Sequence, residues 1–237
     1  MIMKTTPLLA LGIALATGVA NAGDITGTVT LSGTPPAEKV ITPLKDDATC
    51  GKLHAGETPT TKFFVVGPDK GLADVVVMLK GVTGKSTGAS AKPAVLDQKG
   101  CLYIPQILAV QTGQKLMVKN SDPTLHNVHT KPTGGANPEQ NHAQMAGSPE
   151  LAFTFAAPEN FLKFQCDVHP WMFAWVTVVD SPYYAVTDES GKFTIKDVPP
   201  GKYTITALHR KASPKGEDKE VEVKDSGATV DFTLEVK

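Results

Sequence analysis

The segment CDVHPWM places three kinds of metal ligand close together in the chain. Cys166, His169 and Met172 offer a thiolate, an imidazole and a thioether within this segment. Blue copper sites combine one thiolate and two imidazoles with a weak axial thioether. The thiolate binds copper strongly and the thioether tunes the reduction potential, so the segment predicts a site for one-electron chemistry.

The second imidazole must come from another part of the chain. His126, which follows the segment KLMVKN, is the candidate. The predicted site is one type 1 copper ion held by His126, Cys166 and His169, with Met172 as the axial ligand. Met172 alone would more often be a core residue than a ligand, and it is the combination that favours copper. Four protein ligands leave no open coordination position, so we do not expect an enzyme.

Other histidine and methionine residues are weaker candidates. His129 falls on the opposite face of an extended strand from His126, which indicates a surface or packing role. His142 and Met145 lie in the segment KPTGGANPEQNHAQMAGSP, whose composition is typical of a mobile surface loop. A second copper site there is the less favoured alternative.

The elements that would position these ligands are short strands. Runs rich in Val, Thr and Phe are separated by Gly, Pro, Asp and Ser clusters, which is typical of β-strands joined by turns. The predicted class is all-β, with β-sandwiches and little helix. Trp175 is expected to be a core aromatic of the strand WVTVV. The predicted strands are TGTVTL, KFFVV, VVVMLKG, KLMVKN, AFTF, FLKFQC, WVTVV, KFTI, YTITAL, VEV and VDFTLEV.

The first 22 residues have the pattern of a secretory signal peptide. Lys4 precedes an apolar run from Leu8 to Val19, and Ala20-Asn21-Ala22 predicts cleavage after Ala22. No later stretch has the roughly 20 apolar residues that a transmembrane helix needs. We therefore expect a periplasmic or secreted protein with no transmembrane segment.

The charge balance is nearly neutral. The chain has 23 Lys and Arg against 24 Asp and Glu, and removal of Lys4 with the signal peptide gives 22 minus 24, or −2. The lysines are dispersed, so no basic face predicts nucleic-acid binding.

Three cysteines are an odd number for an exported protein, which indicates either intermolecular pairing or one thiol kept for chemistry. Cys166 is that candidate. Cys50 and Cys101 are then free to form a disulfide in an oxidising compartment. The sequence leaves this bridge open, because it does not show whether the two α-carbons come within bridging distance.

The ligand pattern resembles the cupredoxins, and within them most nearly the amicyanin-like proteins, over about residues 93–180. CDVHPWM has the short Cys-x2-His-x2-Met loop of amicyanins, and QILAVQTGQKLMVKNSDPTLHNVHT is similar to the segment with the first ligand. The resemblance implies a Greek-key sandwich with copper ligands His126, Cys166, His169 and Met172. It implies that Asn127 ties the two ligand loops together by hydrogen bonds. Relatives often have a Pro before the second His, where this chain has Asp167-Val168, and Asp167 would keep an amide proton near the thiolate that a proline would not.

We expect the ring edge of His169 to meet redox partners, in small and transient contacts. Pro170 and Trp171 would form the apolar docking patch around it.

The segments around the copper unit resemble the two halves of a carboxypeptidase regulatory-like domain, a transthyretin-like β-sandwich. Thr187-Asp188 and Pro199 to Tyr203 have this resemblance in the second half, and GDITGTVTLSGTPP with VVVMLKG in the first. We therefore expect a cupredoxin domain at 91–180 inserted between parts of this sandwich at 23–90 and 181–237, after a signal peptide at 1–22. Three consecutive small β-units are the alternative, in which strands 24–32 and 192–208 share no sheet.

The function that this pattern favours is one-electron transfer between redox partners by an exported type 1 copper protein. A periplasmic copper carrier would use the same ligands without cycling. In a third hypothesis, the transthyretin-like part binds a carbohydrate or surface ligand and the cupredoxin part is structural, which only fold analogy supports.

Overall fold

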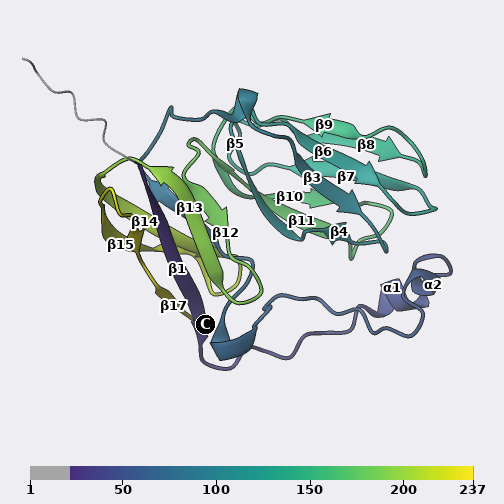
Figure 1. Cartoon of the computed structure of the whole chain (residues 1–237). Coiled ribbons are helices and arrows are strands. Elements are labelled where there is room, and N and C mark those ends of the chain that lie inside the picture. The colour runs from purple at the N-terminus through teal and green to yellow at the C-terminus, as the bar shows by residue number, and fades with distance from the viewer. Residues whose placement is uncertain (1–21, 237) are drawn as a thin grey trace, which may run out of the picture.

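The computed structural model describes residues 22–236, so the predicted signal peptide lies outside the described residues apart from Ala22. Strands dominate (Figure 1), as predicted. Helices are limited to two short α-helices and two 3-10 turns in this part of the chain, namely α1 (Thr42–Asp46), α2 (Cys50–Leu53), η1 (Pro68–Lys70) and η2 (Gly88–Ser90). The strands are β1 (Gly23–Ser32), β2 (Val76–Lys80), β3 (Ala94–Gln98), β4 (Tyr103–Ile104), β5 (Ile107–Gln111), β6 (Leu116–Asn120), β7 (His126–Lys131), β8 (Gln140–Gln144), β9 (Leu151–Phe153), β10 (Glu159–Gln165), β11 (Phe173–Val179), β12 (Tyr184–Val186), β13 (Lys192–Val198), β14 (Gly201–His209), β15 (Ser213–Val223), β16 (Ala228–Thr229) and β17 (Phe232–Glu235).

The first sandwich combines strands from both ends of the chain. β1 pairs antiparallel with β13 and parallel with β16 and β17. The facing sheet has the order β12-β2-β14-β15. Alternating apolar residues of both sheets, including Ile25, Val77, Ile195 and Ile205, form one buried core. Figure 1 shows the purple β1 beside the green β13, so the chain leaves this sandwich after β2 and returns to it at β12.

The central sandwich is formed by residues 94–179, inserted between β2 and β12. One sheet has the order β5-β11-β10-β7-β8 and the other the order β4-β3-β6-β9. Its core includes Leu96, Val118, Phe153 and Phe164, all at most 2% exposed. Burying each such side chain contributes roughly 1.5–3 kcal/mol to the free energy of unfolding. This packing fixes the position of the two sheets that carry the ligand loop.

The two sandwiches contact each other through a small apolar cluster. Val76 and Leu208 of the first sandwich pack with Ile107 of the central one. Trp175 packs against this cluster, and Arg210 lies 3.7 Å from the centre of its indole ring. Trp175 is therefore half-buried between the sandwiches rather than in the core of its own sheet.

Residues 33–75, which we call the arm, connect β1 to β2 and contain α1 and α2. Figure 1 shows the arm leaving the first sandwich and running below the central one, with both helices at its far end. Val40 and Thr60 form a bridge between its two limbs. The prediction of a strand at KFFVV is wrong, because residues 62–66 form only an isolated bridge, from Val66 to Leu72.

The segment around His142 also differs from its prediction. Instead of a mobile loop, Gln140–Gln144 forms β8, which pairs with β7 along the edge of the central sandwich. Its polar composition suits an edge strand, which must resist pairing with other chains.

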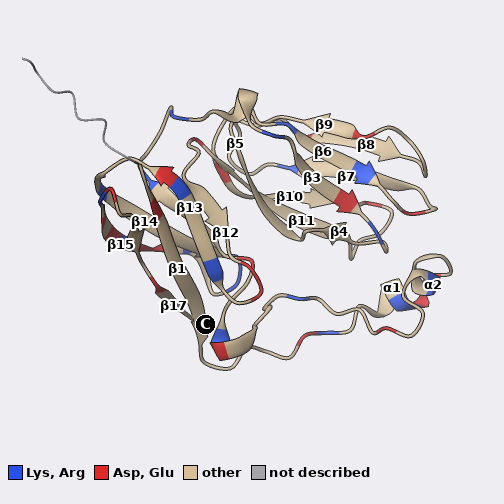
Figure 2. Cartoon of the chain, viewed as in Figure 1, with Lys and Arg blue, Asp and Glu red and all other residues tan. Residues whose placement is uncertain are grey.

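No helix among the described residues is long and apolar enough to cross a membrane. Figure 2 shows acidic and basic residues interspersed over both sandwiches.

Candidate metal centre

Three of the predicted ligands converge at one end of the central sandwich. His126 begins β7, and Cys166 and His169 lie in the loop between β10 and β11. The Nδ1 atoms of the two histidines are 2.9 Å apart, and Cys166 Sγ lies 3.9 Å from His126 Nδ1 and 3.6 Å from His169 Nδ1. All three side chains are buried, with exposed fractions of 0%, 1% and 6%. Ligand atoms from residues 40 positions apart in sequence thus face one small volume.

The ligand loop is held by its own backbone. The amide of Met172 donates to the carbonyl oxygen of His169 across 2.8 Å, and the amide of Cys166 donates to that of Met172 across 3.0 Å. These bonds close a compact turn between two paired strands. Met172 is fully buried in the same apolar cluster as Cys166.

Asn127 joins the two ligand segments. Its side-chain Oδ1 accepts the amide of Asp167 at 2.7 Å, and its backbone amide points at Cys166 Sγ across 3.5 Å. Its Nδ2 donates to the Asp167 carboxylate at 3.0 Å. The Asp167 amide is therefore bonded to Asn127 and not to the thiol. These contacts hold the sulfur in position, as hydrogen bonds around metal ligands commonly do.

Asp122 is a residue of the site that the sequence analysis missed. Its Oδ2 accepts a hydrogen bond from His126 Nε2 at 2.9 Å and from the amide of Cys101 at 2.7 Å. A carboxylate on Nε2 keeps the proton there and leaves Nδ1 free to face the site. Asp122 lies four positions before His126, a spacing that is not distinctive in an irregular turn.

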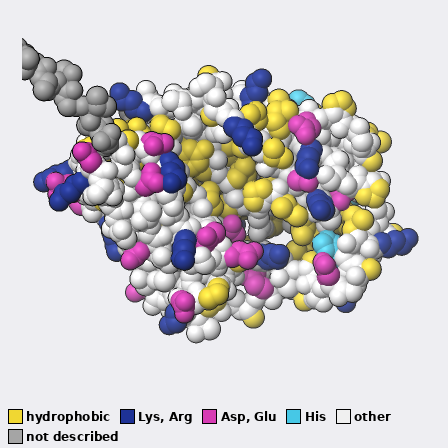
Figure 3. Space-filling model, in the orientation of Figure 1, with side chains coloured by type: hydrophobic (Ala, Val, Ile, Leu, Met, Phe, Trp, Pro, Cys, Tyr) yellow, Lys and Arg dark blue, Asp and Glu magenta, His cyan; other side chains and the backbone are white. Residues whose placement is uncertain are grey.

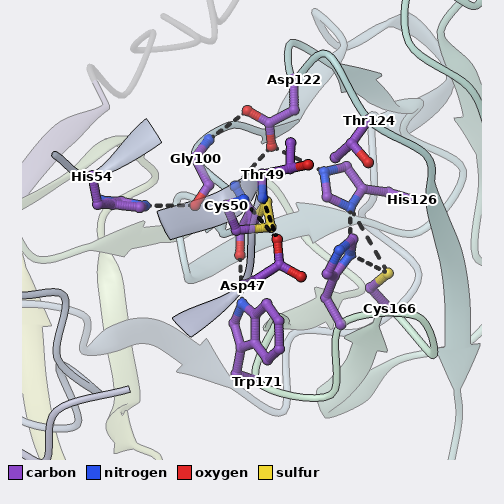
Figure 4. The surroundings of a disulfide bond; sticks show 12 residues. Asp47, Thr49, Cys50, His54, Gly100, Asp122, Thr124, His126, Cys166 and Trp171 are labelled. Carbon is purple, nitrogen blue, oxygen red and sulfur yellow. Dashed lines mark hydrogen bonds and ion pairs between the residues drawn. A yellow bond between two sulfur atoms is a disulfide. The ribbon is translucent and has the colours of Figure 1, made fainter. Parts of the chain in front are cut away.

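The arm covers the site from outside. Cys50, at the start of α2, forms a disulfide with Cys101, with the α-carbons 5.7 Å apart. The sulfur atoms of this bridge and a ring nitrogen of His169 all lie within 4.8 Å of one another. His54 Nε2 lies 2.6 Å from the carbonyl oxygen of Gly100. Figure 4 shows the disulfide and Trp171 grouped beside His126 and Cys166. The expectation of an exposed His169 edge is therefore wrong, because the arm buries this ring.

The docking patch residues differ in their surroundings. Pro170 is exposed, whereas Trp171 is half-buried. The Trp171 indole packs against Leu44 and the disulfide, its Nε1 donates to the carbonyl oxygen of Cys101, and its ring centre lies 5.2 Å from that of His169. Trp171 thus links the ligand loop to the arm.

The remaining candidates lie outside the cluster. His129 Nδ1 lies 2.8 Å from the Asp167 carboxylate and its Nε2 lies 2.5 Å from that of Glu139. His142 is exposed on β8, and Met145 is 60% exposed. Among the described residues, His142 belongs to no group of three or more His, Cys, Asp or Glu side chains that could hold a metal ion.

The electrostatics of the cluster favour the metal-binding form of the thiol. Burial opposes the thiolate of Cys166, but hydrogen bonds from His126 and from the Asn127 amide outweigh it and lower the pKa. Burial also opposes the charged form of His126, yet hydrogen bonds to Asp122 and Cys166 raise its pKa to about 9. Burial and the neighbouring His126 lower the pKa of His169. In the metal-free cluster, the Cys166 thiolate and the His126 imidazolium therefore stabilise each other, whereas His169 is neutral.

The residues present fit a copper ion. Metal–nitrogen and metal–sulfur bonds in such sites are about 2.0–2.3 Å, so ligand atoms around one ion lie roughly 3–4 Å apart. The nitrogen and sulfur atoms described above have this separation. One thiolate, two imidazoles and a buried thioether form a donor set that suits copper.

A family model, the carboxypeptidase regulatory-like domain, matches residues 169–235. This match confirms the resemblance of the second half of the first sandwich. It begins inside the ligand loop and includes β11, although β11 pairs with β5 and β10 of the central sandwich. The structural boundary therefore lies after Val179. No curated protein sequence matches the chain.

Solved structures similar to part of the chain include cupredoxins and a copper-containing nitrite reductase. Amicyanin from Paracoccus versutus has 18% identity and a TM-score of 0.32, over 43% of this chain and 96% of amicyanin. A purple cupredoxin from Nitrosopumilus maritimus has 21% identity and a TM-score of 0.31, over 36% of this chain and 98% of that one. A copper-containing nitrite reductase from Thermus scotoductus has 18% identity and a TM-score of 0.34, over 38% of this chain but only 23% of its own. These likenesses concern part of the chain, and our interpretation of the site rests on its own geometry.

Proposed function

We propose that this chain is an exported type 1 copper protein that transfers single electrons between redox partners. The observation that supports it is the convergence of His126 Nδ1, His169 Nδ1 and Cys166 Sγ in a buried cluster. Copper held by these three residues, with Met172 as the axial ligand, would supply a one-electron couple. The proposal includes no substrate chemistry, because four protein ligands leave no open position.

The protein's own contribution is to hold the ligands still and to exclude water. Asp122 holds the His126 ring, Asn127 holds the Cys166 sulfur, and both ligand segments belong to paired strands. A site whose ligands move little on changing charge has a low reorganisation cost. Burial also favours a transfer protein over the copper carrier, because a carrier must release its ion and here the arm covers His169.

The disulfide supports export, because such bonds persist in oxidising compartments. Redox proteins that dock transiently are the proposed partners. Of the two residues of the proposed docking patch, Pro170 is exposed and Trp171 is half-buried beside the His169 ring. The proposed docking patch thus depends on Pro170 and the accessible part of Trp171 rather than on an exposed imidazole.

The experiment is a titration of the purified mature protein with Cu(II), followed by visible and electron paramagnetic resonance spectra. We expect an intense blue thiolate band and a narrow copper hyperfine splitting, at one copper per chain. Cys166→Ser and His126→Gln should abolish the band, whereas His142→Gln, which changes an exposed histidine of β8, should leave it intact. An uncoloured copper complex in the unchanged protein would refute the proposal.

Electrochemistry distinguishes an electron-transfer protein from a copper carrier. We expect fast, reversible one-electron waves from the copper-loaded protein at an electrode. Irreversible waves, with rapid loss of copper to a chelator from the oxidised or reduced form, would instead indicate a carrier.

A further inference from the structure

A cavity of about 870 Å3 lies between the arm, the ligand-loop end of the central sandwich and the turn after β12. Figure 3 shows a hollow near the middle of this face, with hydrophobic side chains around it. Binding sites for small molecules have volumes of about 300–1,000 Å3 and often lie between domains. The size and position of this cavity are therefore those of a ligand site, and none of the candidate copper ligands lines it.

The walls of the cavity expose apolar side chains to solvent. Val40 and Val66 of the arm are 46% and 40% exposed, and Ile104 on the facing side is 49% exposed. Large apolar side chains gathered at one exposed place mark a binding surface more often than single ones do. An occupant of the cavity would cover all three.

Aromatic rings form a second part of the wall. Phe64 of the arm and Tyr103, Trp171 and Phe173 of the central sandwich all line the cavity. The faces of such rings attract cations, with Trp the strongest. Flat apolar groups also stack on them. The rings therefore suit an occupant with a flat body, a positive charge, or both.

The charged groups of the wall favour a positive charge. Four acidic side chains line the cavity against two lysines, Lys39 and Lys62. Glu38 already accepts hydrogen bonds from Thr61 and Phe64 in the other limb of the arm, and Asp188 accepts them from the backbone of its own turn. Asp74 is half-buried, and its carboxylate has no hydrogen-bond or ion-pair partner within residues 22–236. Burial raises its pKa to about 6, an effect that Lys62 opposes and Glu189 reinforces. On its other side Asp74 borders a smaller pocket that Lys62, Arg210 and Lys211 also line, at a distance too long for an ion pair with the carboxylate.

We propose that this cavity binds an organic cation with a flat apolar body, with its ammonium group at Asp74 and its body against the aromatic rings. The ammonium would supply the partner that the Asp74 carboxylate lacks. Glu189, on the same wall, would add to the attraction. This site does not depend on copper, so a negative binding result would leave the proposed electron transfer unaffected, and the reverse also holds.

The test is isothermal titration calorimetry of the full mature protein at pH 7.5 with three probes of one shape. Phenethylammonium carries a positive charge, 2-phenylethanol is neutral and phenylacetate is negative. We expect phenethylammonium to bind at least about tenfold more tightly than 2-phenylethanol, the ratio that one partly desolvated ion pair of about 1.4 kcal/mol provides. Phenylacetate should bind most weakly. Equal binding of the three, or no binding of phenethylammonium at 10 mM (about 10-fold above a millimolar Kd), would overturn the proposal.

A matched pair of variants locates the charge. Asp74→Asn and Asp69→Asn both change an arm aspartate with a positive φ, of 62° and 53°, and asparagine tolerates this conformation well. Asp74 lines the cavity, whereas Asp69 does not. We expect Asp74→Asn to weaken phenethylammonium binding by about tenfold while 2-phenylethanol binding stays the same. Asp69→Asn should change neither. Unchanged cation binding in Asp74→Asn would refute the assigned position.

A second variant covers the case in which Asp74→Asn does not fold. Glu189→Gln removes the other carboxylate near Asp74 from an exposed turn. It should weaken cation binding by roughly two- to fivefold, as expected of a more solvent-screened charge, without affecting the neutral probe. Tighter or unchanged cation binding would contradict the proposal.

Discussion

The indole Nε1 of Trp171 donates a hydrogen bond to the carbonyl oxygen of Cys101 across 3.1 Å. This bond joins the ligand loop to the half-cystine that holds the arm. Together with the Cys50–Cys101 disulfide and the contact from His54 to Gly100, it closes the outer side of the candidate copper site. The burial of His169 therefore depends on residues far from it in sequence.

We expect Trp171→Phe to lower the free energy of unfolding by about 1–3 kcal/mol, because it leaves the Cys101 carbonyl without its donor. Urea unfolding measures this difference. Trp175→Phe is the matched control, since the Trp175 Nε1 is buried without a hydrogen-bond partner. Its loss removes no bond and keeps a ring beside Arg210, so it should cost less. A larger effect of Trp175→Phe would contradict this account.

The disulfide should protect the site. Replacing Cys50 and Cys101 by Ser opens a loop of 51 residues, which lowers the free energy of unfolding by about 4 kcal/mol in the chain-entropy estimate.

In metal-free protein, the wild type and the double Ser variant each have one free thiol, that of the buried Cys166. We expect a water-soluble thiol reagent to react with it at least about tenfold faster in the double variant, because the arm opens locally.

The control for this experiment breaks a contact elsewhere. Lys80 and Asp218 form an exposed ion pair in the first sandwich, and replacing both by Ala should leave the Cys166 rate unchanged. Equal rates in the wild type and the double Ser variant would show that the arm does not shield the thiol.

Asn127→Ala should weaken copper binding by about 10- to 100-fold, the usual effect of removing a partner that orients metal ligands. The variant loses the Asn127 bonds to the loop at Asp167 and Val168. Asn141→Ala provides the control, because Asn141 contacts Asn127 and Asp167 but not the sulfur. Competition with a chelator of known affinity measures both. An affinity in Asn127→Ala equal to that of Asn141→Ala would remove the proposed role.

His209 should make stability depend on pH. Burial, with a contribution from Arg210, lowers its pKa to about 4, whereas the unfolded value is about 6.5. Between these values the unfolded state binds more protons, so the free energy of unfolding falls as the pH drops from 6.5 towards 4. The loss attributable to His209 should be about 2 kcal/mol at pH 5.

The comparison for this prediction is His209→Asn, whose side-chain oxygen retains an acceptor for the Ala212 amide. Urea unfolding at pH 7 and pH 5 should show a smaller decrease in the variant than in the wild type. Other titrating groups are common to both proteins and cancel in the difference. Parallel decreases would show that His209 does not titrate in this range.

The sequence by itself determined the local features of the protein. Cys166, His169 and Met172 lie in one turn between two strands, so their spacing alone predicts that they converge. Alternating Val, Thr and Phe predicted most of the strands, because side chains on a strand alternate between its two faces. The predicted strands omit β3, β4, β8 and β12, among others, and the strand predicted at 62–66 is wrong, since pairing of such short segments depends on whether a neighbouring edge is available.

The tertiary structure decided what surrounds the ligands. Asp122 at His126, the disulfide beside His169, and Trp171 under the arm are contacts between segments whose positions follow from packing and sheet register. No periodicity in the chain records such contacts, because they depend on how two sandwiches and the arm fit together. The candidate ligands were therefore identifiable from sequence, whereas the closure of the candidate site by residues 41–54 required the fold.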